Sequence, residues 1–130
     1  MNTRLYKDMD YFELAPWWGC RWGDAPDHLI LPKTGVICND GTKDVAAVWA
    51  YLDMTSPVAF IAWVVGNPDA TAKDLLKGLK VAINGVIELC RSQGRTAITT
   101  VCQKSSLASV FEECGFSVRD EDMKQLILNI

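Results

Sequence analysis

The sequence has few of the residue types that metal sites and disulfide frameworks need. It contains one histidine, His28, and its five cysteines form an odd set without a Cys-x-x-Cys pair. Zinc sites mostly use several cysteine and histidine ligands at close spacing, and disulfide frameworks use an even number of cysteines. We therefore expect reduced thiols, no metal and a reducing compartment such as the cytosol.

The chain also lacks long apolar runs and a strong excess of one charge sign. Apolar runs such as residues 58–65 are far shorter than the roughly 20 residues that cross a bilayer. The net charge is −3, with 13 basic and 16 acidic residues, which disfavours a nucleic-acid surface. Residues 1–14 lack the apolar core of a signal peptide. We expect a cytoplasmic protein that binds neither membrane nor nucleic acid.

The 130 residues suffice for one domain with a sizeable core. No repeat or low-complexity segment divides the chain, so we expect a single domain over residues 1–130. Five tryptophans are the unusual feature, and three of them, Trp17, Trp18 and Trp22, lie close together. Two interpretations of this group stay open, packing beneath a long loop and an exposed binding surface.

The N-terminal third alternates short elements with irregular sequence. Residues 3–6 predict a short strand, and Asp8 can cap a helix that Pro16 ends or kinks. Residues 19–34 contain two glycines and two prolines among mixed polar residues. This composition predicts a long surface loop, and such loops often line substrate sites.

The next segment has the pattern of a β-meander. The turn signal at residues 39–41, Asn-Asp-Gly, supplies the positive φ that a tight hairpin needs. Runs rich in β-branched and small apolar residues lie on both sides of it, and a second break follows at residues 55–57. We predict three successive antiparallel strands, at residues 35–38, 44–52 and 58–65.

A long amphipathic helix follows. Thr71 and Asp74 have the spacing of a capping box, and apolar residues then keep helical spacing for more than four turns, to Cys90. Gly94 stands where a left-handed C-terminal cap is expected. Three small residues lie on nearly one line of this helix, which predicts a close contact with a sheet; they are Gly78, Ala82 and Gly85.

The C-terminal third predicts one short helix, which begins near Ser105 or Ser106 and ends at Gly115. Three further strands are predicted around it, at residues 96–102, 116–118 and 123–130. We therefore expect an α/β (α+β) fold with a mixed, mostly antiparallel sheet of six to seven strands and helices on both faces. The final strand would present an edge for pairing with a second copy, as in a homodimer.

One segment carries a more specific pattern, Ser105-x-x-Ala108-x-x-Phe111-Glu112-x-x-Gly115-Phe116. With the order of elements, it resembles the GNAT superfamily of acetyl-coenzyme-A-dependent N-acetyltransferases, and the resemblance runs from about residue 3 to the end. Further motifs are similar to the short GNAT-type proteins often encoded by phages. These motifs are Asp10-Tyr11, Trp17-Trp18, Leu31-Pro32-x-x-Gly35 and Trp63-x-x-x-Asn67-Pro68.

The resemblance implies an acetyl-coenzyme-A site where the fourth and fifth strands splay apart. The residues implied beside the pantetheine arm and the acetyl group are Trp63, Val64 and Val65, with an amide near Val65 as the oxyanion donor. The start of the long helix would bind the pyrophosphate, because free amides and the helix dipole favour anions. The residues implied there are Ala70, Thr71, Ala72 and Lys73. Ser105 and Phe111 are implied as further coenzyme contacts.

The sequence departs from the family pattern at two places. Residues 67–74 read Asn-Pro-Asp-Ala-Thr-Ala-Lys-Asp, without the arginine and glycines of the usual pyrophosphate loop. The two aspartates would repel phosphate, and Lys73 and Lys77 would offset them. Phe111 falls near the tyrosine that protonates the departing thiolate in many members, and phenylalanine donates no proton.

An alkylammonium acceptor has a pKa near ~10.4 and must lose a proton before it attacks a thioester. No acid lies in the strand at residues 58–65. The candidate bases are Tyr51 and Asp53 on the neighbouring strand, Glu13, and His28, with a water chain as the alternative. Cys102 beside Ser105 would suit covalent transfer, but we interpret it as a buried small apolar residue.

The sequence therefore predicts an acetyl-coenzyme-A-dependent N-acetyltransferase that acts on an amine of a small molecule or protein by direct transfer. The alternative is a catalytically inactive GNAT-fold protein that binds a protein partner through the tryptophan group, a host protein if the phage likeness holds. A structural domain without a cofactor is a third hypothesis.

Overall fold

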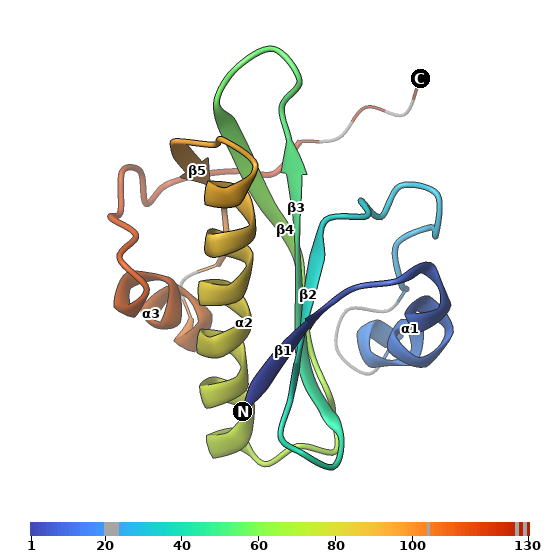
Figure 1. The fold of residues 1–130 in the computed structure, drawn as a ribbon. Coiled ribbons are helices and arrows are strands. Elements are labelled where there is room, and N and C mark those ends of the chain that lie inside the picture. The colour runs from blue at the N-terminus through green and yellow to red at the C-terminus, as the bar shows by residue number, and fades with distance from the viewer. Residues whose placement is uncertain (20–23, 104, 127, 129) are drawn as a thin grey trace.

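The computed structural model describes residues 1–19, 24–103, 105–126, 128 and 130. Five strands form one sheet in the order β1-β2-β3-β4-β5, which is also their order along the chain (Figure 1). The strands are β1 Asn2–Leu5, β2 Gly35–Asn39, β3 Asp44–Leu52, β4 Val58–Gly66 and β5 Ala97–Thr99. The helices are the 3₁₀ turn η1 Asp8–Asp10, α1 Tyr11–Gly19, α2 Ala72–Ser92 and α3 Ser106–Glu113.

The first four strands are antiparallel, and β5 joins β4 in parallel. The predicted meander of three strands is confirmed as β2, β3 and β4. Its first turn is a tight hairpin in which Gly41 has φ 106°, a conformation that glycine adopts without steric cost. The long crossover through α2 then returns the chain to the same edge, as a parallel connection requires.

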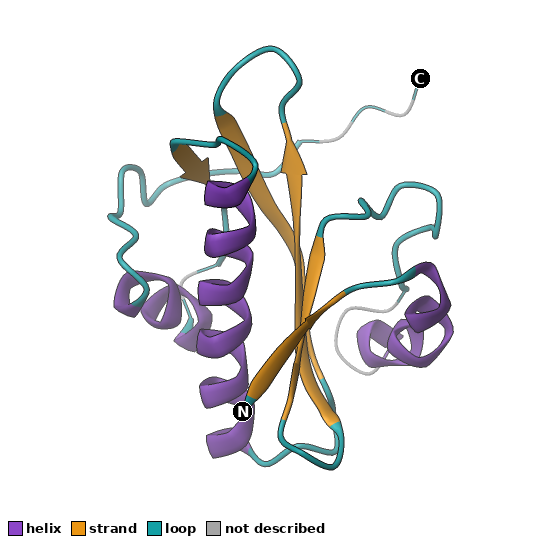
Figure 2. Ribbon diagram, in the orientation of Figure 1, coloured by secondary structure: helices purple, strands orange, loops and turns teal. Residues whose placement is uncertain are grey.

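Helices cover both faces of the sheet, as predicted from the sequence. Figure 2 shows α2 and α3 on one face and α1 on the other. The sheet separates two buried clusters. The larger cluster, beneath α2 and α3, includes Ile61, Ile83, Val86 and Phe111. The smaller cluster, beneath α1, includes Leu14, Trp17, Trp18 and Trp49.

The small residues of α2 bring this helix close to the sheet. A Cβ added to Gly78 would lie 2.6 Å from Cγ1 of Val45, and one added to Gly85 would lie 2.9 Å from Cγ1 of Val36. Ala82, between the two glycines, is fully buried. The predicted close contact is confirmed, and it explains why α2 tolerates two glycines that each cost about 1 kcal/mol of helix propensity.

The ends of α2 and α3 also match the sequence signals. The Thr71 hydroxyl accepts a hydrogen bond from the Asp74 amide at 3.1 Å, and the Ser105 hydroxyl accepts one from the Leu107 amide at 3.2 Å. Gly94 and Gly115 follow α2 and α3 with φ of 76° and 103°. These positive values confirm the two glycines as left-handed C-terminal caps.

The number of strands differs from the prediction, because the described residues form five strands and not six or seven. Strand β5 covers only Ala97–Thr99, and residues 116–118 and 123–126 form no strand. An alternating pattern predicts a strand only where a second strand supplies hydrogen-bond partners. The apolar side chains of Met123 and Leu126 stay exposed, and the segment leaves the body of the protein (Figure 1).

The prediction that Pro16 ends its helix is wrong, since Pro16 lies inside α1, which continues to Gly19. The alternative, a kink at Pro16, stays a prediction. A proline in a helix interior costs about 3 kcal/mol because it removes one hydrogen bond and adds a clash. Leu14, Trp17 and Trp18 are buried on both sides of it, and each buried side chain contributes about 1.5–3 kcal/mol. Burial of this helix face therefore outweighs the cost of the proline.

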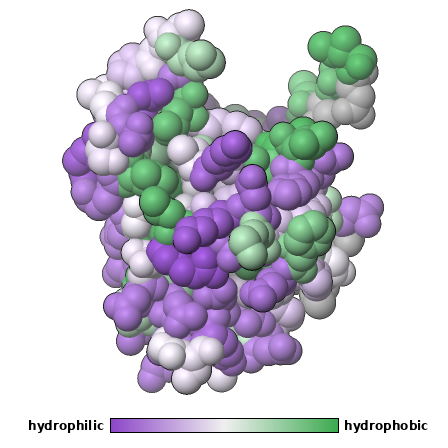
Figure 3. All heavy atoms as spheres, turned by 45° about the vertical axis from the view of Figure 1, so that its right-hand side comes forward, coloured by the Kyte–Doolittle hydropathy of each residue, from purple (hydrophilic) through white to green (hydrophobic). Residues whose placement is uncertain are grey.

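The surface near α1 carries exposed apolar side chains among polar ones. Figure 3 turns the α1 side of the molecule forward and shows the hydrophobic residues as separate patches among polar ones. Met9, Phe12 and Leu29 are exposed on η1, α1 and the following loop. No helix within the described ranges has both the length and the apolar character of a membrane span.

Candidate functional site

The main opening in the sheet lies between β4 and β5. The two strands pair only from Val58–Ala97 to Phe60–Thr99. One further link follows, in which the Thr100 hydroxyl donates to the Ile61 carbonyl at 2.9 Å. Beyond this point, no described part of β5 pairs with residues 62–66. The second half of β4 therefore presents an open backbone edge on this side.

A β-bulge in β4 coincides with the start of the opening. Ala62 pairs with Trp49 and Val65 pairs with Ala47, so Trp63 and Val64 together face a single residue of β3. Trp63 has φ 60° and is the one non-glycine residue with positive φ within the described ranges. A bulge bends its strand and increases the local twist. This bend directs β4 away from β5.

The pairing register determines which amides of β4 remain free. The Asn67 amide donates to the Val45 carbonyl at 2.8 Å, toward β3. Amides alternate in direction along an antiparallel strand, so the Val65 amide also points toward β3 and the Gly66 amide points to the open edge. The side chain of Val65 is buried in the smaller cluster beneath α1. Gly66 thus offers, beside Val65, an amide that has no hydrogen-bond partner among the described residues.

The turn between β4 and α2 is held by Asn67. Its side chain donates to the Asp44 carbonyl at 2.8 Å and accepts from the Asp69 amide at 2.9 Å. Lys43, in the β2–β3 turn, donates to the Asp69 carbonyl at 3.4 Å. The structure therefore brings a third lysine to the start of α2, which the sequence reasoning missed. The pairing of Ala46 with Gly66 explains this proximity.

The first turn of α2 exposes unpaired backbone donors. Thr71, Ala72 and Lys73 are exposed and Ala70 is half-buried. The amides of Ala72 and Lys73 donate to no other described group, whereas the next amide bonds to the Thr71 hydroxyl. Free amides at the positive end of a 21-residue helix attract anions. The predicted pyrophosphate residues therefore share one exposed helix start.

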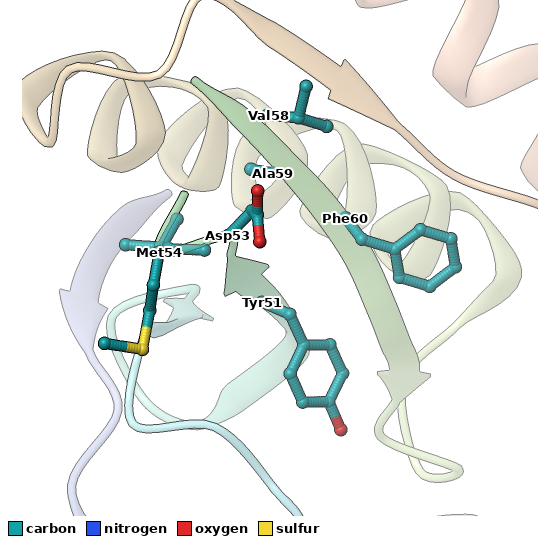
Figure 4. A pocket seen from close by; sticks show the side chains of 7 residues that line it. Tyr51, Asp53, Met54, Val58, Ala59 and Phe60 are labelled. Atoms are coloured by element: carbon teal, nitrogen blue, oxygen red, sulfur yellow. The ribbon is translucent and has the colours of Figure 1, made fainter. Parts of the chain in front are cut away.

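Tyr51 and Asp53 line a shallow hollow of about 410 Å³ at the β3–β4 turn (Figure 4). The Tyr51 hydroxyl donates to the Ile30 carbonyl and accepts from the Trp63 indole, both at 2.7 Å. The hydroxyl is therefore engaged within the protein both as donor and as acceptor. A hydrogen bond from Ser56 lowers the pKa of Asp53, so this carboxylate is a weak base.

The other two candidate bases lie on the α1 side of the sheet. His28 stacks on Tyr11, with ring centroids 4.5 Å apart, and its Nε2 lies 4.0 Å from Oδ1 of Asp8. Glu13 is exposed and lines a second hollow of about 390 Å³ together with Asn67. Neither side chain forms a hydrogen bond with Trp63 or Tyr51 in the described part of the chain.

Phe111 and Ser105 are both engaged within the protein. Phe111 is buried in the larger cluster, with its ring centroid 5.1 Å from that of Phe116. The Ser105 hydroxyl caps α3 and donates to the Gln103 carbonyl at 3.1 Å. Cys102 is exposed, so our interpretation of it as a buried residue is wrong. Desolvation and the charge of Glu112 raise the pKa of its thiol, which disfavours a thiolate nucleophile.

Replacing Phe111 with tyrosine tests the burial of this side chain. Its neighbours are apolar, and an unpaired buried hydroxyl costs about 1–3 kcal/mol. We expect Phe111→Tyr to lower the free energy of unfolding by that amount. Urea denaturation measures the change, and an unchanged free energy of unfolding would contradict the buried placement.

The structure decides between the two interpretations of the tryptophan group for two of its three members. Trp17 and Trp18 are buried between α1 and the sheet, so packing is confirmed for them and the exposed interpretation is wrong. Trp22 lies outside the described residues. No cluster of three or more potential metal ligands occurs in the ranges that the structure describes.

Comparison with known proteins finds similar solved structures. No protein-family model and no curated protein match the sequence. The Rv2747 protein of Mycobacterium tuberculosis, solved with CoA and NLQ, is 11% identical with TM-score 0.75, covering 92% of this chain and 74% of that one. Glucosamine-6-phosphate N-acetyltransferase of Arabidopsis thaliana is 17% identical with TM-score 0.65, covering 96% and 97%.

A third similar structure is an aminoglycoside acetyltransferase from an uncultured soil metagenomic sample, solved with sisomicin. It is 10% identical with TM-score 0.70, covering 98% of this chain and 95% of that one. At such identities the likeness shows the fold alone. The chain therefore has a GNAT-like fold of mixed α+β class, with the open β4 edge and the α2 start described above.

Proposed function

We propose that this protein binds acetyl-coenzyme A and transfers the acetyl group directly to an amine. The observation that carries this proposal is the pairing of β4 with β5, which ends at Phe60 and leaves an open edge that leads toward the exposed start of α2. An extended pantetheine arm can add to such an edge as a strand does. Its pyrophosphate would then meet the α2 amides.

In this proposal Trp63, Val64 and Val65 flank the pantetheine arm and the thioester. The Gly66 amide, next to Val65, is the best-directed donor for the oxyanion, because the register turns it to the open edge. One such donor contributes about 2.7–4 kcal/mol where it has been removed by mutation. Ala70, Thr71, Ala72 and Lys73 hold the pyrophosphate, and Lys43 adds positive charge beside them.

The chemistry follows from these groups. A neutral amine attacks the thioester carbonyl, a tetrahedral oxyanion forms, and the carbon–sulfur bond breaks to give an amide and coenzyme-A thiolate. The amine proton leaves through water, since the Tyr51 hydroxyl is engaged within the protein and Asp53 is a weak base. The thiol leaves without a tyrosine acid, because a thiolate is already a good leaving group near neutral pH.

The acceptor is proposed by class alone, as an amine of a small molecule or of a protein. The similar structures include acetyltransferases named for an amino sugar phosphate and for aminoglycosides. Loop residues 24–34, which reach the sheet at Tyr51, are suited to contact the acceptor. A cytoplasmic location and a phage origin belong to the same proposal.

Calorimetry with acetyl-coenzyme A tests the proposal. We expect the wild-type protein to bind with a micromolar dissociation constant and Lys73→Glu to weaken binding about 10- to 100-fold, because a charge-assisted phosphate contact is worth about 1.5–3 kcal/mol. Lys33→Glu is the matched control, since Lys33 is exposed on the loop before β2. Binding to this control should equal that of the wild type.

Absence of binding at millimolar acetyl-coenzyme A would contradict the proposal. The inactive, partner-binding protein would then be the better hypothesis, although the buried Trp17 and Trp18 no longer support a contact through them. Equal losses for Lys73→Glu and Lys33→Glu would show that net charge, and not the start of α2, determines the affinity.

A further inference from the structure

One hydroxyl joins three segments of the chain on the α1 face of the sheet. The Tyr51 hydroxyl accepts a hydrogen bond from the Trp63 indole and donates one to the Ile30 carbonyl. Tyr51 lies two residues after Trp49 on β3, so both side chains point to this face. The hydroxyl therefore ties β3, the β4 bulge and the loop at residues 24–34 together.

The bulge that this hydroxyl holds has an unfavourable backbone conformation. Trp63 has φ 60°, where a bulky side chain is disfavoured because its Cβ crowds the backbone. Such strain persists only where surrounding contacts hold the residue in place. The indole of Trp63 is half-buried against the smaller cluster and makes its hydrogen bond to Tyr51. These two contacts oppose relaxation of the bulge.

The bulge in turn sets the direction of the open edge of β4. If Trp63 relaxed to extended backbone, Val64 would change its register against β3, and the strand would lose the bend at which it leaves β5. A hydrogen bond on one face of the sheet would thus control backbone donors at the edge of the sheet. Tyr51 itself need not touch the coenzyme or the reacting atoms.

We propose that Tyr51 is a positioning residue, which holds the strained Trp63 bulge so that the Gly66 amide faces the pantetheine arm. This inference rests on the proposed coenzyme site. It assigns Tyr51 a role different from that of a base. It also links the loop at residues 24–34 to the same bulge, through the Ile30 carbonyl.

Removal of the hydroxyl alone is the first test. Tyr51→Phe should keep the fold, because the side chain is exposed at the end of β3. We expect it to weaken acetyl-coenzyme-A binding about tenfold, as loss of one net hydrogen bond allows. Tyr6→Phe is the matched control, because the Tyr6 hydroxyl is buried without a hydrogen-bond partner among the described residues. Its affinity should stay at the wild-type value.

A second pair of variants separates positioning from a general loss of structure. Trp63→Gly removes the indole, but glycine adopts φ 60° without strain. In this background, Tyr51→Phe should have no further effect on affinity. Trp63→Phe, which keeps the strain and loses the donor, should resemble Tyr51→Phe. An equal effect of Tyr51→Phe in the wild type and in Trp63→Gly would overturn the proposal.

NMR spectra of the coenzyme-free protein keep this test independent of the proposed function. In Tyr51→Phe we expect shifted backbone amide signals at residues 62–66 and faster exchange of the Trp63 indole proton. Unchanged signals would overturn the positioning role. If the wild type binds no acetyl-coenzyme A, the proposed function fails, while shifted bulge signals would still support the tie between Tyr51 and the bulge.

Discussion

Replacing Trp18 with alanine should lower the free energy of unfolding by about 3–5 kcal/mol, the range measured for buried tryptophan truncations. Trp18 is 3% exposed and its ring centroid lies 5.5 Å from that of Trp49. The truncation would leave a cavity between α1 and the sheet. Guanidinium unfolding, followed by circular dichroism, measures the change.

Phe12→Ala is the control for Trp18→Ala, because Phe12 lies on the same helix and is 74% exposed. We expect it to change the free energy of unfolding by less than about 0.5 kcal/mol. Similar values for the two variants would contradict the docking of α1 described above. A Trp17/Trp18 double alanine variant would therefore report on folding, and it cannot serve as a test of partner contact.

Replacing Gly35 with alanine should lower the free energy of unfolding by about 2–3 kcal/mol, through overpacking. Gly35 pairs directly with Trp49 across β2 and β3. An added Cβ would lie 2.5 Å from two atoms of the Trp49 ring and 3.0 Å from Cβ of Tyr6. The Trp49 ring is fully buried, and the close packing of protein interiors opposes its displacement.

Gly19→Ala provides the comparison for Gly35→Ala. A Cβ at Gly19 would meet no atom of the described residues within 4 Å, and alanine is favoured over glycine in a helix. Thermal unfolding should show a lower midpoint for Gly35→Ala and an equal or higher midpoint for Gly19→Ala. If Gly35→Ala matched the wild type, the indole of Trp49 would not cover this position.

Local signals in the sequence predict most of the fold. The Asn-Asp-Gly turn, the Thr71 cap and the caps at Gly94 and Gly115 are each determined by residues within one or two turns of the chain. Such signals need no tertiary partner. The predicted tail strands needed a tertiary partner. The continuation of α1 past Pro16 has no local signal either, because the burial of Trp17 and Trp18 is a tertiary effect.

Local sequence signals predict less of the candidate site than of the fold. Neither the bulge at Trp63 nor the proximity of Lys43 to Asp69 has a local signature, because both arise from the register between β3 and β4. The open β4 edge was expected from the family resemblance. The hydrogen bond between Tyr51 and Trp63 joins residues twelve positions apart across a hairpin, and no sequence spacing predicts that their side chains meet.

The separation of the two buried clusters by the sheet offers a route to engineering. Residues such as Ile83 and Val86 lie on the opposite face of the sheet from Trp63 and Tyr51. Substitutions at sites that are distant and share no partner usually add in free energy. The larger cluster can therefore be redesigned for thermal resistance while the tyrosine–tryptophan pair and its loop stay as they are.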